Sequence, residues 1–513
     1  MKEKSNTVFI VSLVLCAIIA IWAVFLNESF SVVSNAIFGF FTVDFGWLYL
    51  LAMLSFVIFA VFIACSKYGK IKLGPDDSMP EYRTVTWFAM LFGCGMGVGL
   101  VFWGVAEPIS HYMGPAAGID PMSPAAADFA FEASFMHWGI HPWANYAIIG
   151  LALAYFQFRK GKPGLISSTL SPLTEGKSYE GWLSKLVDVL AVFATVAGVV
   201  TSLGLGVLQI NSGLNFMFGI PTSLLMEIGI ILVISVIYIG TAVLGIEKGI
   251  SKVSDLNLVI AICLMLACFI VGPHVEILNN LVGGVGNYIQ NFFHDSFMIT
   301  GSGDNGWTLG WRIFYWAWWI AWAPFVGVFI ARISKGRTIR EFIAGVVMVP
   351  AVASILWFAV FGTLGTHLGV NGILNADQLS GVAGAPETGL FLVLQQYPFG
   401  IIISVVALVL LCTFFITSAN SGTFVLSMLS SNGNLNPPKP KMLIWGVIQS
   451  LMAVGLLIAG GLKPLQTISI AAAFPFIFIM FAVMVSTVKA LSTDPAVASE
   501  DDEAIEATQL ETA

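Results

Sequence analysis

Charged residues are scarce in this chain. Of its 513 residues, 10% are Asp, Glu, Lys or Arg and 58% are apolar, and the mean hydropathy is +0.90. A soluble domain carries roughly 25% charged residues, so this chain cannot cover its own surface with polar groups in water. The low charge argues against a soluble domain and predicts a membrane protein. The net charge is −7 and no basic cluster is present, which argues against a nucleic-acid surface.

Cysteine is also scarce, and the six copies form no CxxC pair. All six lie inside apolar runs, which predicts buried, reduced thiols and argues against disulfides and metal ligands. They are Cys16, Cys65, Cys94, Cys263, Cys268 and Cys412.

Long apolar runs dominate the sequence instead. A helix needs about 20 apolar residues to cross a bilayer, and twelve runs meet or approach that length, centred near residues 17, 56, 96, 147, 203, 234, 264, 320, 354, 413, 451 and 477. The first run, from Val8 to Leu26, is too long for a signal-peptide core, so we expect a retained membrane helix. The mixed segment from His274 to Phe297 is predicted to be an amphipathic helix outside the membrane.

The basic residues predict the orientation of the spans. When twelve spans are threaded from a cytoplasmic N-terminus, 20 of the 22 Lys and Arg residues fall on the inner side. Only Arg312 and Lys463 fall outside. Both termini are therefore predicted to be cytoplasmic, and the acidic tail from Asp494 to Ala513 is predicted to be disordered.

Four alternating glycines predict a break in the middle of the third span. They are Gly93, Gly95, Gly97 and Gly99. Each glycine weakens the helix and lets a ligand approach the backbone. Free amide and carbonyl groups inside the bilayer need partners, which an ion or a substrate carboxylate can provide. The alternative is close helix packing through small residues.

An indole cluster in the eighth span predicts a site for an organic cation. Trp318 and Trp322 are four residues apart on one helix face, and Trp319 lies beside them. Indole faces attract cations that cannot donate hydrogen bonds. The alternative is a packing role. Trp311 and Trp316, which lie nearer the end of the span, suit an interfacial belt.

Prolines in two spans predict further irregular helices. Pro324 in the eighth span and Pro142 in the fourth each remove a backbone hydrogen bond. We therefore expect broken helices in both halves of the protein. His137 and His141, also in the fourth span, are interpreted as packed or interfacial side chains, with proton transfer as the alternative.

Hydroxyl groups deep in two spans offer hard oxygen ligands of the kind that Na⁺ prefers, although such hydroxyls often bond only their own helix. The tenth span has Thr417 and Ser418, and the fifth has Thr195, Thr201 and Ser202. No charged residue lies at the centre of the third, eighth or tenth span. That absence argues against proton coupling and favours a zwitterionic solute over a fixed cation.

These motifs resemble the betaine/choline/carnitine transporter family. The resemblance is carried by GMGVG and WGVAEP in the third span, by WGIHPWANY from Trp138 to Tyr146, and by YWAWWIAWAPFVGVFIARISKGRTIRE from Tyr315 to Glu341. It covers nearly the whole chain. The resemblance implies an all-α membrane protein with 12 transmembrane helices and a homotrimeric assembly. Two extra helices would precede a leucine-transporter-type pair of inverted five-helix repeats.

The implied segments are a cytoplasmic tail over residues 1–7, two extra helices and a basic loop over 8–84, a first repeat over 85–275, an extracellular amphipathic helix over 276–305, a second repeat over 306–490 and a cytoplasmic tail over 491–513.

The resemblance also implies the binding residues. Aromatic side chains would surround a methylated ammonium group and line its pathway: Trp318, Trp319, Trp322, Trp138, Trp143 and Tyr146. Unwound backbone would meet the carboxylate at Gly95, Met96, Gly97 and Gly99, and the gate would continue through Phe325 and Phe329. One Na⁺ would be held by Gly93, Met96, Phe414, Thr417 and Ser418. A second Na⁺ would use Thr195 and Thr201, although Val199 stands where such members carry their second threonine.

The sequence thus predicts a symporter in a bacterial cell membrane that imports glycine betaine or a similar quaternary-ammonium solute with Na⁺ and needs no organic cofactor. One alternative is a carrier of choline, carnitine or dimethylsulfoniopropionate driven by protons or exchange. A remote alternative is a membrane-embedded enzyme, for which the sequence has no GxSxG, HExxH or paired intramembrane carboxylates.

Overall fold

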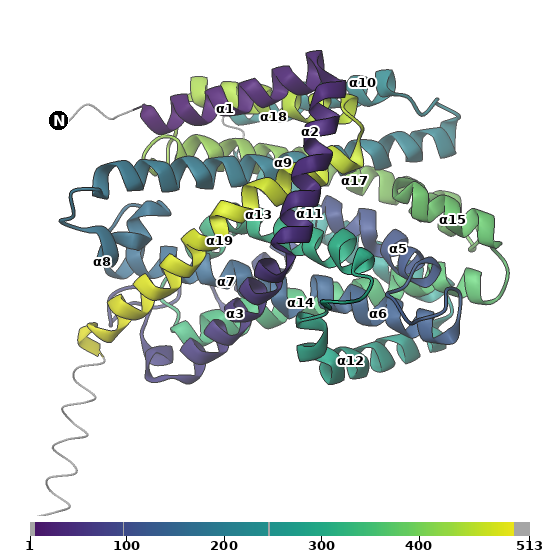
Figure 1. Cartoon of the computed structure of the whole chain (residues 1–513), viewed down its shortest axis with the longest axis horizontal. Coiled ribbons are helices and arrows are strands. Elements are labelled where there is room, and N and C mark those ends of the chain that lie inside the picture. Colours follow the sequence, from purple (N-terminus) through teal and green to yellow (C-terminus); the bar gives the residue numbers. More distant parts are fainter. Residues whose placement is uncertain (1–5, 96, 245–246, 497–513) are drawn as a thin grey trace, which may run out of the picture.

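The structure is a computed structural model that describes residues 6–95, 97–244 and 247–496 (Figure 1). The described residues form helices joined by short loops, with a single β-bridge between Lys72 and Thr338. Apolar side chains fill the interior and also cover much of the outer surface. Such a surface suits lipid and not water.

Ten helices of the described chain are long and apolar enough to cross a bilayer. They are α1 (Thr7–Phe25), α3 (Gly46–Cys65), α9 (Glu180–Phe218), α10 (Leu224–Leu244), α11 (Glu247–Val271), α13 (Ile313–Arg332), α14 (Ile339–Val370), α17 (Gly400–Leu429), α18 (Lys439–Ile458) and α19 (Leu462–Ser492). A bent pair, α4 (Thr84–Gly95) and α5 (Val98–Met113), forms an eleventh span. These elements match eleven of the twelve predicted spans.

The fourth predicted span corresponds to α7 (Ile140–Ala154), whose 15 residues continue into a π-turn over Tyr155–Arg159. The helix before it, α6 (Pro124–Trp138), ends at Gly139. Pro142 therefore lies in the first turn of α7, where a missing N–H costs little. The helix is interrupted one turn earlier, at Gly139, so the prediction of an irregular helix at this proline is confirmed. The count of twelve spans and the two five-helix repeats stay predictions.

Five further helices of the described chain connect the spanning helices or cover them. They are α2 (Asn27–Gly39), α8 (Ser171–Thr174), α12 (His274–Ser296), α15 (Ala376–Gly384) and α16 (Gly389–Leu394). The helix predicted near residues 274–297 is confirmed as α12, which packs against α6 and α14 along one edge of the bundle (Figure 1).

The helix at the centre of the bundle is α13, which packs against α7, α9 and α19 (Figure 1). It runs unbroken from Ile313 to Arg332 through Pro324. The prediction that Pro324 breaks the eighth span was therefore wrong. Ala323, Pro324 and Val326 are buried, and packing on several sides holds the helical path despite one lost hydrogen bond.

The six cysteines are all free, as predicted, but only Cys16 and Cys268 are buried. Cys65 and Cys263 are exposed on the outer faces of α3 and α11. The prediction of six buried thiols was wrong because an apolar run does not distinguish a face toward protein from a face toward lipid.

The C-terminal end of α19 is fastened by a buried charge cluster. Asp494 is fully buried and accepts hydrogen bonds from Arg159 Nη2 at 2.6 Å and from the Tyr155 hydroxyl at 2.7 Å. Lys160 Nζ lies 3.2 Å from the same carboxylate, and Arg159 also pairs with Asp76 at 2.7 Å. Burial alone would raise the pKa of Asp494, but these hydrogen bonds outweigh it and lower the pKa.

Asp494 therefore belongs to the folded protein, and the prediction that the disordered tail begins there was wrong. The rest of that tail, from residue 497 onward, lies outside the described residues. At the other terminus, Asn6 accepts a hydrogen bond from Lys441 at 3.1 Å. Both ends of the described chain thus contact basic loops, and in Figure 1 both lie toward the left.

Removal of the Asp494 carboxylate should destabilise the protein. We expect Asp494→Asn to lower the free energy of unfolding at pH 7 by about 2–4 kcal/mol, because the buried Arg159 loses its main partner. Thermal unfolding of the purified protein in detergent measures the effect. Folding lowers the pKa of Asp494, so its contribution is complete above the ordinary aspartate pKa of about 4 and is lost as pH falls through the lowered value.

Asp76 provides the control because it pairs with the same arginine but is 73% exposed. Asp76→Asn should leave the melting temperature almost unchanged. An equal loss of stability in the two variants would contradict this account.

Candidate functional site

The predicted break in the third span is confirmed. The segments Thr84–Cys94 and Val98–Met113 meet at an angle of 63°. Gly97 has an extended backbone between them, and its carbonyl accepts from Leu100 N at 3.1 Å at the start of α5. Met96 lies outside the described residues. The chain therefore carries irregular backbone in the middle of an apolar span.

A cavity of about 570 Å³ lies beside this break. Its lining comes from α4, α5, α7, α9, α11, α13, α14 and α17 and from the end of α6. The predicted residues among that lining are Gly93, Gly97, Gly99, Trp138, Trp143, Tyr146, Trp318, Trp319, Trp322, Phe325, Phe329, Phe414, Thr417 and Ser418. Thr195 and Thr201 do not line it.

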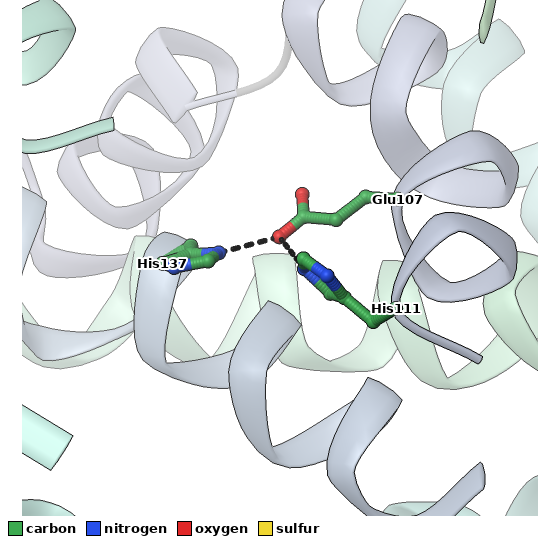
Figure 2. Close-up of side chains that lie close together, drawn as sticks. All are labelled: Glu107, His111 and His137. Atoms are coloured by element: carbon green, nitrogen blue, oxygen red, sulfur yellow. Dashed lines mark hydrogen bonds and ion pairs between the residues drawn. The ribbon is translucent and has the colours of Figure 1, made fainter. Parts of the chain in front are cut away.

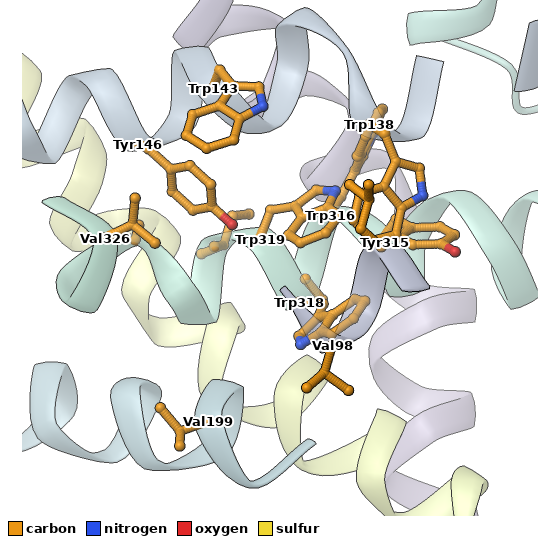
Figure 3. Close-up of a cluster of buried hydrophobic side chains, with 14 of the residues drawn as sticks. Val98, Trp138, Trp143, Tyr146, Val199, Tyr315, Trp316, Trp318, Trp319 and Val326 are labelled. Atoms are coloured by element: carbon orange, nitrogen blue, oxygen red, sulfur yellow. The ribbon is translucent and has the colours of Figure 1, made fainter. Parts of the chain in front are cut away.

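Indole rings form the deep wall of the cavity (Figure 3). Trp318 and Trp319 stack with ring centroids 4.8 Å apart and planes 14° from parallel. Trp138 approaches edge-on, 4.8 Å from Trp319 and 6.2 Å from Trp318. A Cβ atom on Gly99 would lie 2.8 Å from Trp318 and 3.2 Å from Trp138. Only a glycine lets these rings pack this closely against the start of α5. We call Trp138, Trp318, Trp319 and Trp322 the indole box.

The fourth ring of the box, Trp322, packs against a second glycine. A Cβ atom on Gly198 of α9 would lie 2.7 Å from its ring, and Phe325 meets it edge-on at 4.9 Å. The indole nitrogens of Trp318 and Trp322 have no hydrogen-bond partner among the described residues. The box therefore combines apolar ring faces with two buried N–H groups that have no hydrogen-bond partner in the described chain.

Oxygen atoms gather on the wall formed by α17. Thr417 Oγ1 donates within its own helix to the Thr413 carbonyl at 3.0 Å, and Ser418 lines the cavity beside it. Asn257 of α11 donates to Thr417 Oγ1 at 3.4 Å, while its own carbonyl oxygen is buried without a partner in the described chain. Sequence analysis missed Asn257, although the polar run Ser254, Asp255 and Asn257 at the start of the seventh span could have indicated it.

The two threonines predicted for a second ion do not come together. Thr195 Oγ1 bonds to the preceding turn of α9 at 2.8 Å. Thr201 Oγ1 faces α19, with the Leu465 carbonyl at 2.8 Å and Ser469 Oγ at 2.9 Å. Ser202 of the same helix lines the cavity instead.

The cavity opens toward the loops that carry the basic residues. Trp318 is 1% and Trp319 is 7% exposed at the deep end, whereas Phe329, three residues before Arg332, is 36% exposed. Asp255 is exposed at that wider end. Beyond the box the bundle is closed, and Trp103 packs edge-on against Trp311 with centroids 5.4 Å apart.

His137 and His141 are packed side chains, in agreement with the interpretation favoured from the sequence. His137 and His141 are both fully buried. His141 shares a hydrogen bond with Ser296 at 3.0 Å and stacks on Trp316 with centroids 5.0 Å apart. Trp316 is fully buried, so its assignment to an interfacial belt was wrong.

Glu107 is a buried charge that sequence analysis did not identify as a functional residue. In the structure α5 continues to Met113, and Glu107 is 0% exposed. The signal was present, because His111 follows at the i+4 spacing of one helix face.

Comparisons with known proteins match the chain over almost its full length. The profile of BCCT, the betaine/carnitine/choline family transporter, matches residues 7–496. The chain is 47% identical to the glycine betaine transporter OpuD of Bacillus subtilis, over 96% of both chains. It is 46% identical to a probable glycine betaine transporter of Desulfitobacterium hafniense, over 96% of this chain and 98% of that one.

A relative named for another solute, the ectoine/hydroxyectoine transporter of Virgibacillus pantothenticus, is 41% identical over 97% of this chain and 99% of its own. The family resemblance found in the motifs is therefore confirmed. Members of this family are transporters and not enzymes. The chain, with its many apolar helices, is a multi-pass membrane protein that belongs to the betaine/carnitine/choline transporter family.

Proposed function

We propose that this protein is a Na⁺-coupled symporter that imports glycine betaine into a bacterial cell by alternating access. The observation that carries the proposal is the indole box, which lies deep in the cavity beside the broken span. A trimethylammonium group has a positive charge and no N–H to donate. It therefore gains more from ring faces than from hydrogen-bond acceptors.

The charge distribution in the cavity supports a zwitterion. Asp255 is the one ionisable acid or base among its described lining outside the cysteine and tyrosine side chains, and it lies at the exposed end. No carboxylate among the described residues therefore lines the deep end, where it could contact the ammonium group of choline. A betaine carries its own carboxylate, for which the irregular backbone around Gly97 offers donors at the cavity wall.

The sodium ion is proposed to bind between α4 and α17. Gly93, Phe414, Thr417 and Ser418 all line the same cavity, and they offer carbonyl and hydroxyl oxygens. Such oxygens are the ligands that hard cations take in proteins. For a second ion, Thr195 and Thr201 would first have to release their present hydrogen bonds.

We assign the basic, open side of the bundle to the cytoplasm, because the cytoplasmic loops of membrane proteins generally carry an excess of Lys and Arg. The cavity would then be open to the cytoplasm and closed toward the outside, as in one end state of an alternating-access cycle. Both termini would be cytoplasmic, the membrane would be the bacterial inner membrane, and the homotrimer stays a prediction.

A second candidate solute is ectoine, because one relative is named as an ectoine/hydroxyectoine transporter. Ectoine is also a zwitterion, but its ring nitrogens carry N–H groups that donate hydrogen bonds. Indole faces provide no acceptor for those groups, so the box favours a fully methylated nitrogen.

Transport by purified protein in proteoliposomes tests the proposal. We expect uptake of radiolabelled glycine betaine to need an inward Na⁺ gradient and to stop when K⁺ replaces Na⁺. Unlabelled betaine should compete, and choline and ectoine should compete at least about tenfold less well. Betaine uptake that is indifferent to Na⁺ but follows a proton gradient would reject the sodium coupling.

Gly99→Ala should impair recognition of the solute. The added methyl group would collide with Trp318 at 2.8 Å, and overpacking of this kind costs about 1–3 kcal/mol. We therefore expect the KM for betaine to rise roughly tenfold or more. Gly240→Ala on α10 is the control, because nothing lies within 4 Å of its Cβ position. Unchanged KM in Gly99→Ala would show that this contact does not shape the site.

Ser418→Ala should weaken sodium binding and leave the box intact. Loss of one oxygen ligand worth about 1 kcal/mol should raise the Na⁺ concentration for half-maximal uptake about fivefold. Ser427→Ala is the matched control on α17, because its hydroxyl bonds only the Thr423 carbonyl, at 2.7 Å. The same Na⁺ curve in wild type and Ser418→Ala would remove Ser418 from the ion site.

A further inference from the structure

A single carboxylate behind the indole box receives hydrogen bonds from four side chains. Glu107 Oε1 lies 2.6 Å from His137 Nδ1 and 3.3 Å from His111 Nε2, so both rings point at the same oxygen (Figure 2). Its Oε2 accepts from Trp138 Nε1 at 2.8 Å and from the Tyr315 hydroxyl at 2.5 Å. These partners come from α5, α6 and α13, so the carboxylate links three helices.

The second nitrogen of each histidine sets the direction of these hydrogen bonds. His111 Nδ1 accepts from Trp307 Nε1 at 3.2 Å, and His137 Nε2 accepts from Arg312 Nε at 3.4 Å. Indole and guanidinium nitrogens can only donate. Each ring must therefore carry its proton on the nitrogen that faces Glu107. All four side chains therefore donate to Glu107, and only an ionised carboxylate can accept four hydrogen bonds.

The positions of the two histidine protons argue against a metal ion at this cluster. Glu107, His111 and His137 place three ligand atoms within 4.8 Å of one another, which is a spacing that a metal can use. A metal would need a lone pair on the two nitrogens that now carry protons. If the protons moved to the other nitrogens, those N–H groups would face the N–H groups of Trp307 and Arg312. The Arg312 guanidinium, which is fully buried, already supplies the positive charge.

Two partners of Glu107 support the indole box. Trp138 belongs to the box itself, and its edge rests on Trp319. Tyr315 stacks on Trp319 with ring centroids 5.8 Å apart, and its centroid lies 6.1 Å from that of Trp318. Figure 3 shows these rings in one cluster. Glu107 does not line the cavity. It contacts the box directly at the Trp138 N–H group, and indirectly through the hydroxyl group of Tyr315.

We propose that Glu107 is a positioning residue for solute recognition: its ionised carboxylate fixes the Trp138 indole and the Tyr315 ring and thereby holds the box in its binding geometry. The role of the box in solute binding rests on the proposed function. The anchoring of two rings by one carboxylate is a property of the protein alone, and it can be tested without any solute.

Glu107→Gln is the informative substitution because it keeps the size of the side chain. An amide has one acceptor oxygen and one NH₂ donor. The NH₂ group must therefore face either the two histidines or the pair of Trp138 and Tyr315. The histidine pair cannot reverse, because Trp307 and Arg312 hold its tautomers. Trp138 cannot accept at all. The Tyr315 hydroxyl can accept from the NH₂ group, so the amide oxygen stays with the two histidines and the Trp138 indole loses its anchor.

The first measurement is a double-mutant cycle on betaine binding. Affinity is measured by titration calorimetry in detergent with Na⁺ for wild type, Glu107→Gln, Trp138→Phe and the double variant. Trp138→Phe keeps an aromatic ring but removes the N–H that Glu107 binds. We expect Glu107→Gln to weaken binding about tenfold or more in wild type and by less than about threefold in the Trp138→Phe background. Equal factors in both backgrounds would overturn the proposal, because Glu107 would then act independently of Trp138.

The matched control is Glu132→Gln. Glu132 is a second buried carboxylate, on α6, and it accepts from Asn291 at 2.9 Å without touching the box. We expect the affinity for betaine to stay within twofold of wild type. If Glu132→Gln weakened binding as much as Glu107→Gln, a general effect of removing buried charge would replace the proposal.

The second measurement needs no solute. Hydrogen exchange, followed by mass spectrometry on solute-free protein, should be faster in Glu107→Gln than in wild type over residues 131–140 and 313–319. In Glu132→Gln it should be unchanged over residues 313–319, the segment that does not contain the substitution. If wild type bound no betaine but this difference appeared, the proposed substrate would be wrong and the anchoring would stand. Unchanged exchange in Glu107→Gln would overturn the anchoring, whatever the substrate.

Discussion

A broken helix inside a bilayer leaves backbone amides and carbonyls without partners, and lipid cannot supply them. In this protein the break lies between Gly95 and Val98, where the helix turns by 63°. The cavity, the indole box and the α17 hydroxyls all gather around that break. The break also explains the small residues near it, since Gly99 lets two indole rings approach the backbone within contact distance. An unbroken third span would remove the polar centre of an otherwise apolar protein.

No full charge lines the deep end of the cavity among the described residues. Glu107 and Arg312 are buried at the closed end, and Asp494 and Arg159 are buried near the basic loops. Each makes several hydrogen bonds, as a charge in a low-dielectric interior needs. The box between them is lined by rings and uncharged polar groups. A zwitterion suits such a site, because it brings both of its own charges and leaves no net charge to be neutralised.

The sequence predicted the features that depend on composition within one helix. Alternating glycines indicate a break whatever packs around them, and Trp318, Trp319 and Trp322 fall near one another by helical spacing alone. It failed where the outcome depends on neighbouring helices. Pro324 lies in an unbroken helix because packing holds the helix together. Thr201 faces α19 and not the cavity, and nothing in its own span indicates that direction. Glu107 was missed because a charge near the end of an apolar run looks like the start of a loop.

The central claim is that indole rings bind the solute through its positive charge and not only through its apolar surface. The most direct test compares glycine betaine with 3,3-dimethylbutanoate, in which a carbon atom replaces the quaternary nitrogen and the shape is kept. Their affinities for the purified protein, measured by titration calorimetry in the presence of Na⁺, isolate that charge. Cation–π attraction at a desolvated site is worth about 2 kcal/mol, so betaine should bind at least about tenfold more tightly. Equal affinities would contradict the account.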